Sequence, residues 1–200
     1  MFDLAETVRS LIGAWRLLLN KPDALRLFDA STDGFWRSFA AIIPVAPLYF
    51  LTALTDRQSI LADPTEAGTY SEGLFWAEKT VSLAFDWVTF PILLALLGGF
   101  LGMKRHYALY IVVRNWATVV MMVPFGVLSL LGLAGIVAGD AMALASLAAF
   151  AFSLWYGYVI ARKALQVGVD VAIGVVILDF LVSFAVVGTI ARIFGIDAGV

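Results

Sequence analysis

Charged side chains inside apolar segments are the residues of this sequence with the greatest capacity for chemistry. Asp179 lies near the middle of the last long apolar segment. A carboxylate at the centre of a membrane helix costs about 2.5–3.5 kcal/mol on insertion scales, so it must face other helices, pair with a cation or hold a proton. Arg114, about two turns into an earlier apolar segment, is the expected partner.

Asp86 and Asn115 extend this polar set, and two interpretations of it are open. The first is a proton or ion relay through Asp86 and Asp179. The second is a structural clamp, in which Arg114 and Asn115 hold Asp179 and lock the helices together. We favour the clamp, because the sequence places a single carboxylate at each depth and no histidine nearby.

Residues for enzymatic, metal or cofactor chemistry are not evident. His106 is the only histidine, and its basic surroundings predict a lipid-headgroup contact. The chain has no cysteine, which excludes disulfides and thiolate sites. No Ser–His–Asp set, catalytic carboxylate pair or glycine-rich phosphate loop can be drawn. We therefore expect no catalytic, metal-binding or cofactor-binding residues, and a protein that is not an enzyme.

Composition sets the kind of element that can position the charged residues. The chain has 200 residues, of which 62% are hydrophobic and 14% are charged. A soluble domain carries about 45–50% apolar and about 25% charged residues. A water-soluble domain of this size could not bury so much apolar surface. In a lipid bilayer the apolar side chains can instead face hydrocarbon. The net charge of −2 and the lack of a basic run argue against a nucleic-acid partner.

Apolar segments of membrane-spanning length predict an all-α bundle of about five transmembrane helices in residues 34–200. The polar stretch from Thr55 to Gly73 reads as an aqueous loop. The stretch from Tyr107 to Gly139 is long for one upright span and short for two, so we predict one tilted helix bent at Pro124. A half-helix followed by a span is the alternative. The predicted spans are about 35–54, 80–103, 110–138, 141–161 and 169–191.

Residues 1–33 differ from the rest and predict a cytoplasmic, amphipathic helical segment. Apolar side chains recur at helical spacing on one face, and charged ones fall mostly on the other. Such a helix is too charged to span a bilayer and suits the membrane interface or a partner protein. Asn20 and Pro22 then favour a second short helix. The apolar face of the first helix consists of Leu4, Val8, Leu11, Trp15 and Leu18.

Lysine and arginine are distributed unevenly between the two ends of the predicted spans. Four of them precede the first span and Arg37 lies at its entry, and the pairs Lys104–Arg105 and Arg162–Lys163 follow the second and fourth spans. The other ends carry only Arg57, Lys79 and Arg192. By the positive-inside rule we expect a cytoplasmic N-terminus, an external C-terminus and a location in the inner (plasma) membrane.

Aromatic residues gather near the cytoplasmic end of the fourth span, in Trp155-Tyr156-Gly157-Tyr158. Tryptophan and tyrosine are enriched where a membrane protein meets the headgroup layer. We interpret this group as part of an aromatic belt, with a lipid or ligand site as the alternative.

A family resemblance covers nearly the whole chain in architecture, and its sequence features lie in the N-terminal part. A cytosolic helix, the stretch from Leu11 to Phe28 with its Pro22, and the Gly34-Phe-Trp-Arg-Ser-Phe39 run before a proline-bearing span resemble the bacterial branch of the Yip1 domain family. The resemblance implies five spans and brings no catalytic residues. Eukaryotic members resemble vesicle-traffic proteins that contact small GTPases through longer N-terminal regions, so that role is not expected here.

These patterns predict a non-enzymatic protein that organises the membrane or binds a partner. The expected partners are the lipid bilayer and a protein bound through the N-terminal helix. A small transporter or channel with an intramembrane carboxylate relay is one alternative. An accessory subunit of a larger membrane complex is another. The sequence indicates no oligomeric state.

Overall fold

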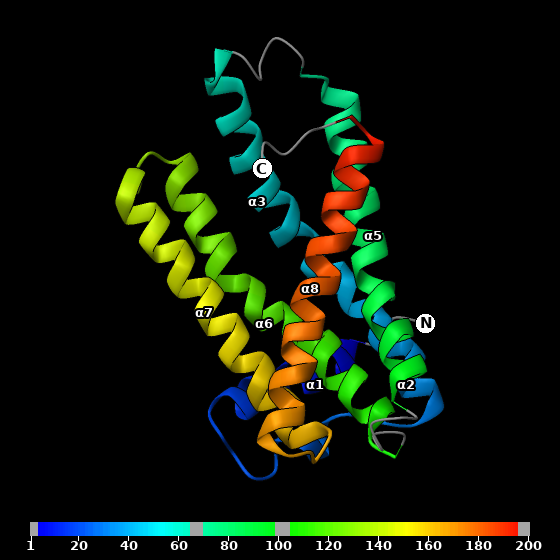
Figure 1. Cartoon of the computed structure of the whole chain (residues 1–200). Coiled ribbons are helices and arrows are strands. Elements are labelled where there is room, and N and C mark those ends of the chain that lie inside the picture. Colours follow the sequence, from blue (N-terminus) through cyan, green and yellow to red (C-terminus); the bar gives the residue numbers. More distant parts are fainter. Residues whose placement is uncertain (1–3, 65–69, 99–104, 196–200) are drawn as a thin grey trace.

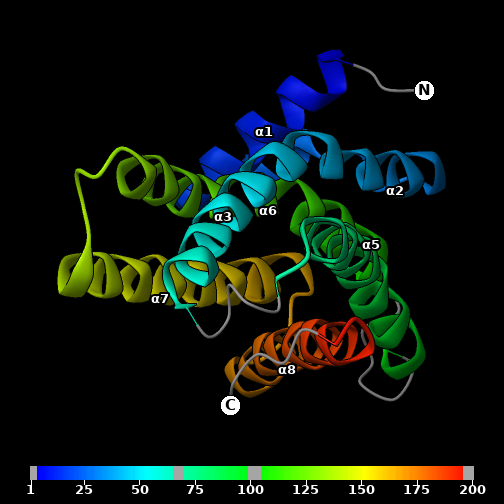
Figure 2. The same ribbon diagram turned by 90° about the horizontal axis from the view of Figure 1, so that it is seen from above.

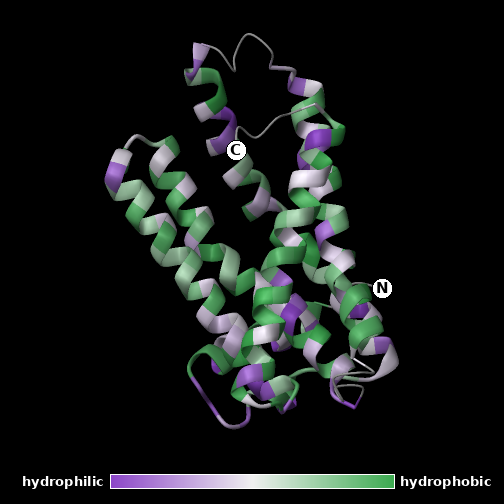
Figure 3. Ribbon diagram, in the orientation of Figure 1, coloured by the Kyte–Doolittle hydropathy of each residue, from purple (hydrophilic) through white to green (hydrophobic). Residues whose placement is uncertain are grey.

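The computed structural model describes residues 4–64, 70–98 and 105–195, and every regular element in these ranges is a helix (Figure 1). Hydrophobic positions dominate along the long helices (Figure 3). Five helical stretches are long and apolar enough to cross a membrane. The elements are α1 (Leu4–Leu18), η1 (Ala24–Leu27), α2 (Thr32–Ser38), η2 (Phe39–Ala41), α3 (Ile42–Ala62), α5 (Glu72–Leu97), α6 (Tyr107–Leu133), α7 (Gly139–Ala164) and α8 (Val169–Ile193).

The first span is a composite of α2, η2 and α3, which together cover Thr32–Ala62. Ser31 begins it as the N-cap, because its hydroxyl accepts a hydrogen bond from the Gly34 N–H at 3.1 Å. The 3₁₀ stretch η2 lies just before Pro44. A proline has no N–H to donate and its ring collides with the carbonyl four residues earlier, which here belongs to Ala40. The tighter 3₁₀ winding accommodates that collision.

The helices on the outer side of the bundle are longer than expected. Residues 55–73 were predicted to form an aqueous loop, but α3 continues to Ala62 and α5 begins at Glu72. Their polar residues form ion pairs, Arg57 with Glu72 at 3.0 Å and Lys79 with Asp56 at 3.0 Å. A hydropathy pattern predicts where the apolar part of a helix ends. Ion pairs such as these stabilise further helical turns beyond that point, so the helix itself is longer than its apolar part. The predicted end of the second span, at residues 99–103, lies outside the described residues.

The stretch from Tyr107 to Gly139 contains one long helix, as the preferred interpretation expects. Helix α6 has 27 residues, with Pro124 in its interior. Its length of about 40 Å exceeds the hydrocarbon thickness of about 30 Å. The alternative of a half-helix followed by a span is wrong. Helices α7 and α8 begin and end within three residues of the predicted limits.

Helix α6 is the centre of the packing. It contacts α3, α7, α1 and α2, whereas α5 packs mainly on α8, and α8 also contacts α7. Figure 2 shows α3, α6 and α7 on one side of the bundle and α5 and α8 on the other. Trp116 and Ile111 of α6 are among the fully buried side chains. Residues that bridge α6 and α8 therefore connect the two sides.

The N-terminal segment forms α1 and a short 3₁₀ turn, η1. The expected second short helix is η1, which has 3₁₀ geometry and has Asp23, not Asn20, as its N-cap residue. Asn20 adopts a left-handed conformation, with φ of 59°, and therefore ends α1 instead of capping a new helix. Helix α1 lies on the outside of the bundle against α6, near the end where α7 finishes and α8 begins (Figure 1).

Candidate functional site

Arg114 of α6 and Asp179 of α8 form an ion pair inside the bundle. The guanidinium donates from Nε at 3.1 Å and from Nη2 at 2.7 Å to the two carboxylate oxygens. The Arg114 side chain is only 11% exposed, and its guanidinium lies 4.7 Å from the centre of the Phe90 ring. Bidentate geometry and an aromatic face are the environment that arginine favours away from water. The structure therefore brings together the two residues expected to pair.

Asp86 of α5 reaches the same part of α8. The Ser183 hydroxyl donates a hydrogen bond to its carboxylate at 2.5 Å. Ser183 is one turn, about 6 Å, beyond Asp179 along the helix. Asp86 and Asp179 therefore flank one short stretch of α8 and lie about one turn apart along it. We call Asp86, Arg114, Asp179 and Ser183 the polar cluster.

A cavity of about 270 Å³ lies beside the polar cluster, between α6, α7 and α8. Arg114, Asp179 and Ser183 contribute to its wall, together with the hydroxyl-bearing residues Thr118 and Ser153. The remaining wall is mostly apolar. A space of this kind can hold water or a small molecule next to the ion pair.

Asn115 does not belong to the polar cluster. Its amide donates a hydrogen bond to the Ser38 hydroxyl at 3.0 Å, and Ser38 in turn donates to the Phe35 carbonyl at 2.7 Å. Asn115 is fully buried and joins α6 to α2. The expectation that Asn115 helps to hold Asp179 is corrected. Consecutive helix positions point about 100° apart, so neighbours in sequence face different helices.

Three of the five residues predicted for the apolar face of α1 point away from the bundle. Leu4 is 70% exposed, and Val8 and Trp15 are each 55% exposed. Leu11 and Leu18, predicted to share this face, are instead partly buried against the core. The side of α1 that faces the bundle carries mainly small and polar residues, Glu6, Thr7, Ser10, Gly13 and Ala14, and it ends with the buried Leu17.

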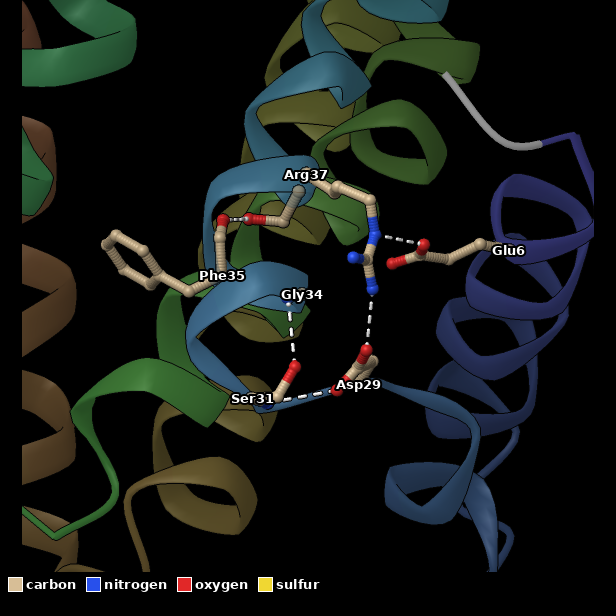
Figure 4. Close-up of polar contacts among 7 residues, drawn as sticks. Glu6, Asp29, Ser31, Gly34, Phe35 and Arg37 are labelled. Carbon is tan, nitrogen blue, oxygen red and sulfur yellow. Dashed lines mark hydrogen bonds and ion pairs between the residues drawn. The ribbon is translucent and has the colours of Figure 1, made fainter. Parts of the chain in front are cut away.

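Arg37 of α2 holds the beginning of α1 in place, an arrangement that the sequence did not suggest. Figure 4 shows its guanidinium between two carboxylates, with Nε 2.6 Å from Glu6 and Nη2 2.7 Å from Asp29. The Glu6 side chain is only 7% exposed. We call Glu6, Asp29 and Arg37 the α1 anchor. The signal in the sequence was a carboxylate on the small-residue side of α1, which marks that side as packed.

The turn before α2 fixes the position of Asp29. Its carboxylate accepts a hydrogen bond from the Ser31 N–H at 2.9 Å. This bond, followed by the Ser31 side chain and Arg37, lowers the pKa of Asp29 below its ordinary value. Gly34 lies so close that an added Cβ would stand 2.2 Å from the Asp29 carbonyl oxygen.

The predicted aromatic belt divides into two groups. Tyr156 is fully buried, and its hydroxyl donates a hydrogen bond to the Ala14 carbonyl at 2.6 Å, so it fastens α7 to α1. Trp155 is 51% exposed. Tyr156 was therefore wrongly placed in the belt, whereas Trp155 has the exposure that a lipid contact requires.

Five helices long and apolar enough to cross a membrane surround a small set of buried charges, an architecture compatible with a helical membrane protein. Comparisons with protein-family models, curated proteins and solved structures find no match for this chain. The resemblance to the Yip1 domain family therefore stays a prediction.

Proposed function

We propose that this chain is a non-enzymatic, multi-pass protein of the plasma membrane that organises the cytoplasmic leaflet through helix α1. The observation that carries the proposal is the orientation of α1. Its small and polar side is fastened to the bundle, and Leu4, Val8 and Trp15 are left exposed. An interfacial helix has these features, with an apolar face for acyl chains and too much charge to span.

The contacts of α1 support a fixed position. The α1 anchor holds its first turns through Arg37, and Tyr156 holds its middle. Exposed apolar residues on a fixed helix lose their contact with water only if lipid or another protein covers them. The positive-inside rule assigns this end of the bundle to the cytoplasm, because Arg105, Arg162 and Lys163 lie there.

The test uses the absence of cysteine from the chain, which allows a single reporter to be placed. The Ile12→Cys variant is labelled with an environment-sensitive fluorophore and reconstituted into vesicles. Ile12 is 49% exposed on the apolar side of α1. We expect a blue-shifted emission that lipids carrying a quencher in their acyl chains reduce strongly.

Lys21→Cys, in the exposed turn after α1, is the matched control and should emit as a water-exposed label. If the Ile12 label also emits at the wavelength found in water and escapes the lipid quencher, α1 does not lie in the leaflet and the proposal fails.

The cavity beside the polar cluster favours a second candidate function, that of a small transporter with a carboxylate relay. Two carboxylates, Asp86 and Asp179, flank one stretch of α8, and about 270 Å³ of space adjoins Asp179. Proton flux into vesicles that disappears in Asp179→Asn, with an unchanged melting temperature, would establish this function. Equal flux in wild type, variant and protein-free vesicles would exclude it.

A further inference from the structure

A groove runs along the outside of the bundle between α7 and α8. It encloses about 570 Å³, and its walls are apolar and aromatic. Ile173, Ile177 and Phe180 of α8 are 47%, 52% and 43% exposed, so the groove is open toward the surrounding lipid. Phe150 and Phe180 stack edge to face at its deep end, with ring centres 5.5 Å apart.

A second pocket of about 280 Å³ continues the groove toward the cytoplasmic end of α7. Trp155 and Tyr158 line both spaces, so the groove and the second pocket adjoin at these two aromatic side chains. The second pocket also has Arg162, Lys163 and Asn20 in its wall. A single elongated site therefore has an apolar end, an aromatic middle and a basic end.

The two cations at the basic end have neutral hydrogen-bond partners. Arg162 donates to the Val167 carbonyl, and Lys163 donates to the side-chain carbonyl of Asn20. Among the residues that the structure describes, neither forms an ion pair, and the nearby Asp170 of α8 is not paired with them. Hydrogen bonds to neutral groups thus hold both cationic side chains in place, and no ion pair neutralises either charge within the described part of the chain.

The dimensions of the groove match one leaflet. From Val169 to Phe180 along α8 the rise is about 16 Å, at about 1.5 Å per residue. Half of a hydrocarbon core of about 30 Å is about 15 Å. An acyl chain that enters at the basic end would therefore reach the Phe150–Phe180 pair near the middle of the bilayer, with its phosphate level with Arg162 and Lys163.

We propose that this site binds one anionic glycerophospholipid of the cytoplasmic leaflet. The acyl chain occupies the α7–α8 groove, Trp155 and Tyr158 contact the glycerol region, and Arg162 and Lys163 bind the phosphate and the anionic headgroup. Basic pockets between membrane helices on the cytoplasmic side recognise anionic lipids in this manner. The proposal does not depend on how α1 meets the membrane.

The test measures lipid binding to the full chain by native mass spectrometry, with phosphatidylglycerol and phosphatidylcholine of equal chain length as probes. We expect one tightly bound phosphatidylglycerol and weaker binding of phosphatidylcholine. The double variant Arg162→Gln/Lys163→Gln should reduce this preference by roughly tenfold to thirtyfold, as expected for the loss of two cations near the membrane surface. Arg192→Gln, which removes an exposed cation at the other end of α8, is the matched control and should keep the preference.

A second pair of variants tests the groove without changing any charge. Ile173→Trp fills the groove and should weaken the binding of both lipids, whereas Leu147→Trp, at a 62% exposed position of α7 outside the groove, should not. Equal preference in wild type and the double variant would overturn the proposal. So would an equal loss in Arg192→Gln, or full binding by Ile173→Trp. If the double variant does not fold, the comparison of the two tryptophan variants decides.

Discussion

Two residues of α8, one turn apart, each bind a different helix. Asp179 pairs with Arg114 on α6, and Ser183 donates to Asp86 on α5. In hydrocarbon a polar group without a partner inside the protein has no water to replace it, so such contacts decide which helices stay together. These two residues place α8 between the helices on either side of the bundle.

The Asp179→Asn variant tests how much the ion pair contributes to stability. It leaves the Arg114 guanidinium without its counter-ion, and breaking a buried pair in this way costs about 3 kcal/mol or more. We expect a clearly lower melting temperature in detergent. The matched control is Asp86→Asn, because an asparagine oxygen can still accept the hydrogen bond from Ser183 and the loss should be smaller. Equal melting temperatures for wild type and Asp179→Asn would show that the pair does not clamp the bundle.

Gly34 is required by the tight approach of α2 to the preceding turn. In Gly34→Ala the new Cβ would lie 2.2 Å from the Asp29 carbonyl oxygen, so the turn must open. We expect a destabilisation of about 1–3 kcal/mol, measured by thermal unfolding. Gly73→Ala is the control: nothing lies within 4 Å of its added Cβ, and alanine favours a helix over glycine. If the two variants are equally stable, the turn adapts without cost.

The Arg114–Asp179 pair was predictable because a cation and an anion in apolar segments have few other partners. The partner of Asn115 was not. In the sequence Asn115 is the neighbour of Arg114, but successive side chains of a helix point about 100° apart. The Asn115 side chain therefore meets Ser38 of α2 and not Asp179 of α8. The α1 anchor was also missed, since Glu6 and Arg37 are 31 residues apart and both look like ordinary surface charges.

At the scale of elements, hydropathy located all five long helices but not all their ends. Helices α7 and α8 end where polarity rises, so their limits followed from the pattern. Helices α3 and α5 extend past that boundary, because Arg57–Glu72 and Asp56–Lys79 stabilise their outer turns against each other. Such pairs depend on two segments meeting in space, and hydropathy carries no information about that meeting.

The attachment of α1 to α2 depends on Arg37. In Arg37→Gln the Glu6 and Asp29 carboxylates lose their shared cation, and Glu6 is too buried for water to replace it fully. We expect the backbone amides of α1 to exchange hydrogen at least about tenfold faster, measured by mass spectrometry. Arg26→Gln, which removes an exposed cation of η1, should leave the exchange unchanged. Unaltered exchange in Arg37→Gln would mean that packing alone holds α1.

At the scale of the whole molecule, five spans place the two ends of the chain on opposite sides of the membrane. From the distribution of lysine and arginine we predict that the N-terminal side is cytoplasmic. The end of the bundle that carries α1, Arg162 and Lys163 is then internal, and the paired outer turns of α3 and α5 are external.

Single cysteines test this orientation, since the chain has none of its own. Ser71→Cys, before α5, should react with a membrane-impermeant maleimide in intact cells. Lys21→Cys, after α1, should react only after the membrane is permeabilised. Both positions are exposed, so access depends on the side of the membrane alone. The reverse pattern would show that the orientation is inverted.

The ion pair between α6 and α8 also has a consequence for synthesis. Arg114 precedes Asp179 by 65 residues, so at about 5–20 residues per second it waits roughly 3–13 s for its counter-ion. During that interval an arginine at full depth would be unpaired, at a cost of about 2.5–3.5 kcal/mol. Its position about 10 Å from the start of α6 allows the side chain to reach back toward cytoplasmic water. We therefore predict that α6 settles to its final depth as the last helix emerges beside it and supplies the counter-ion.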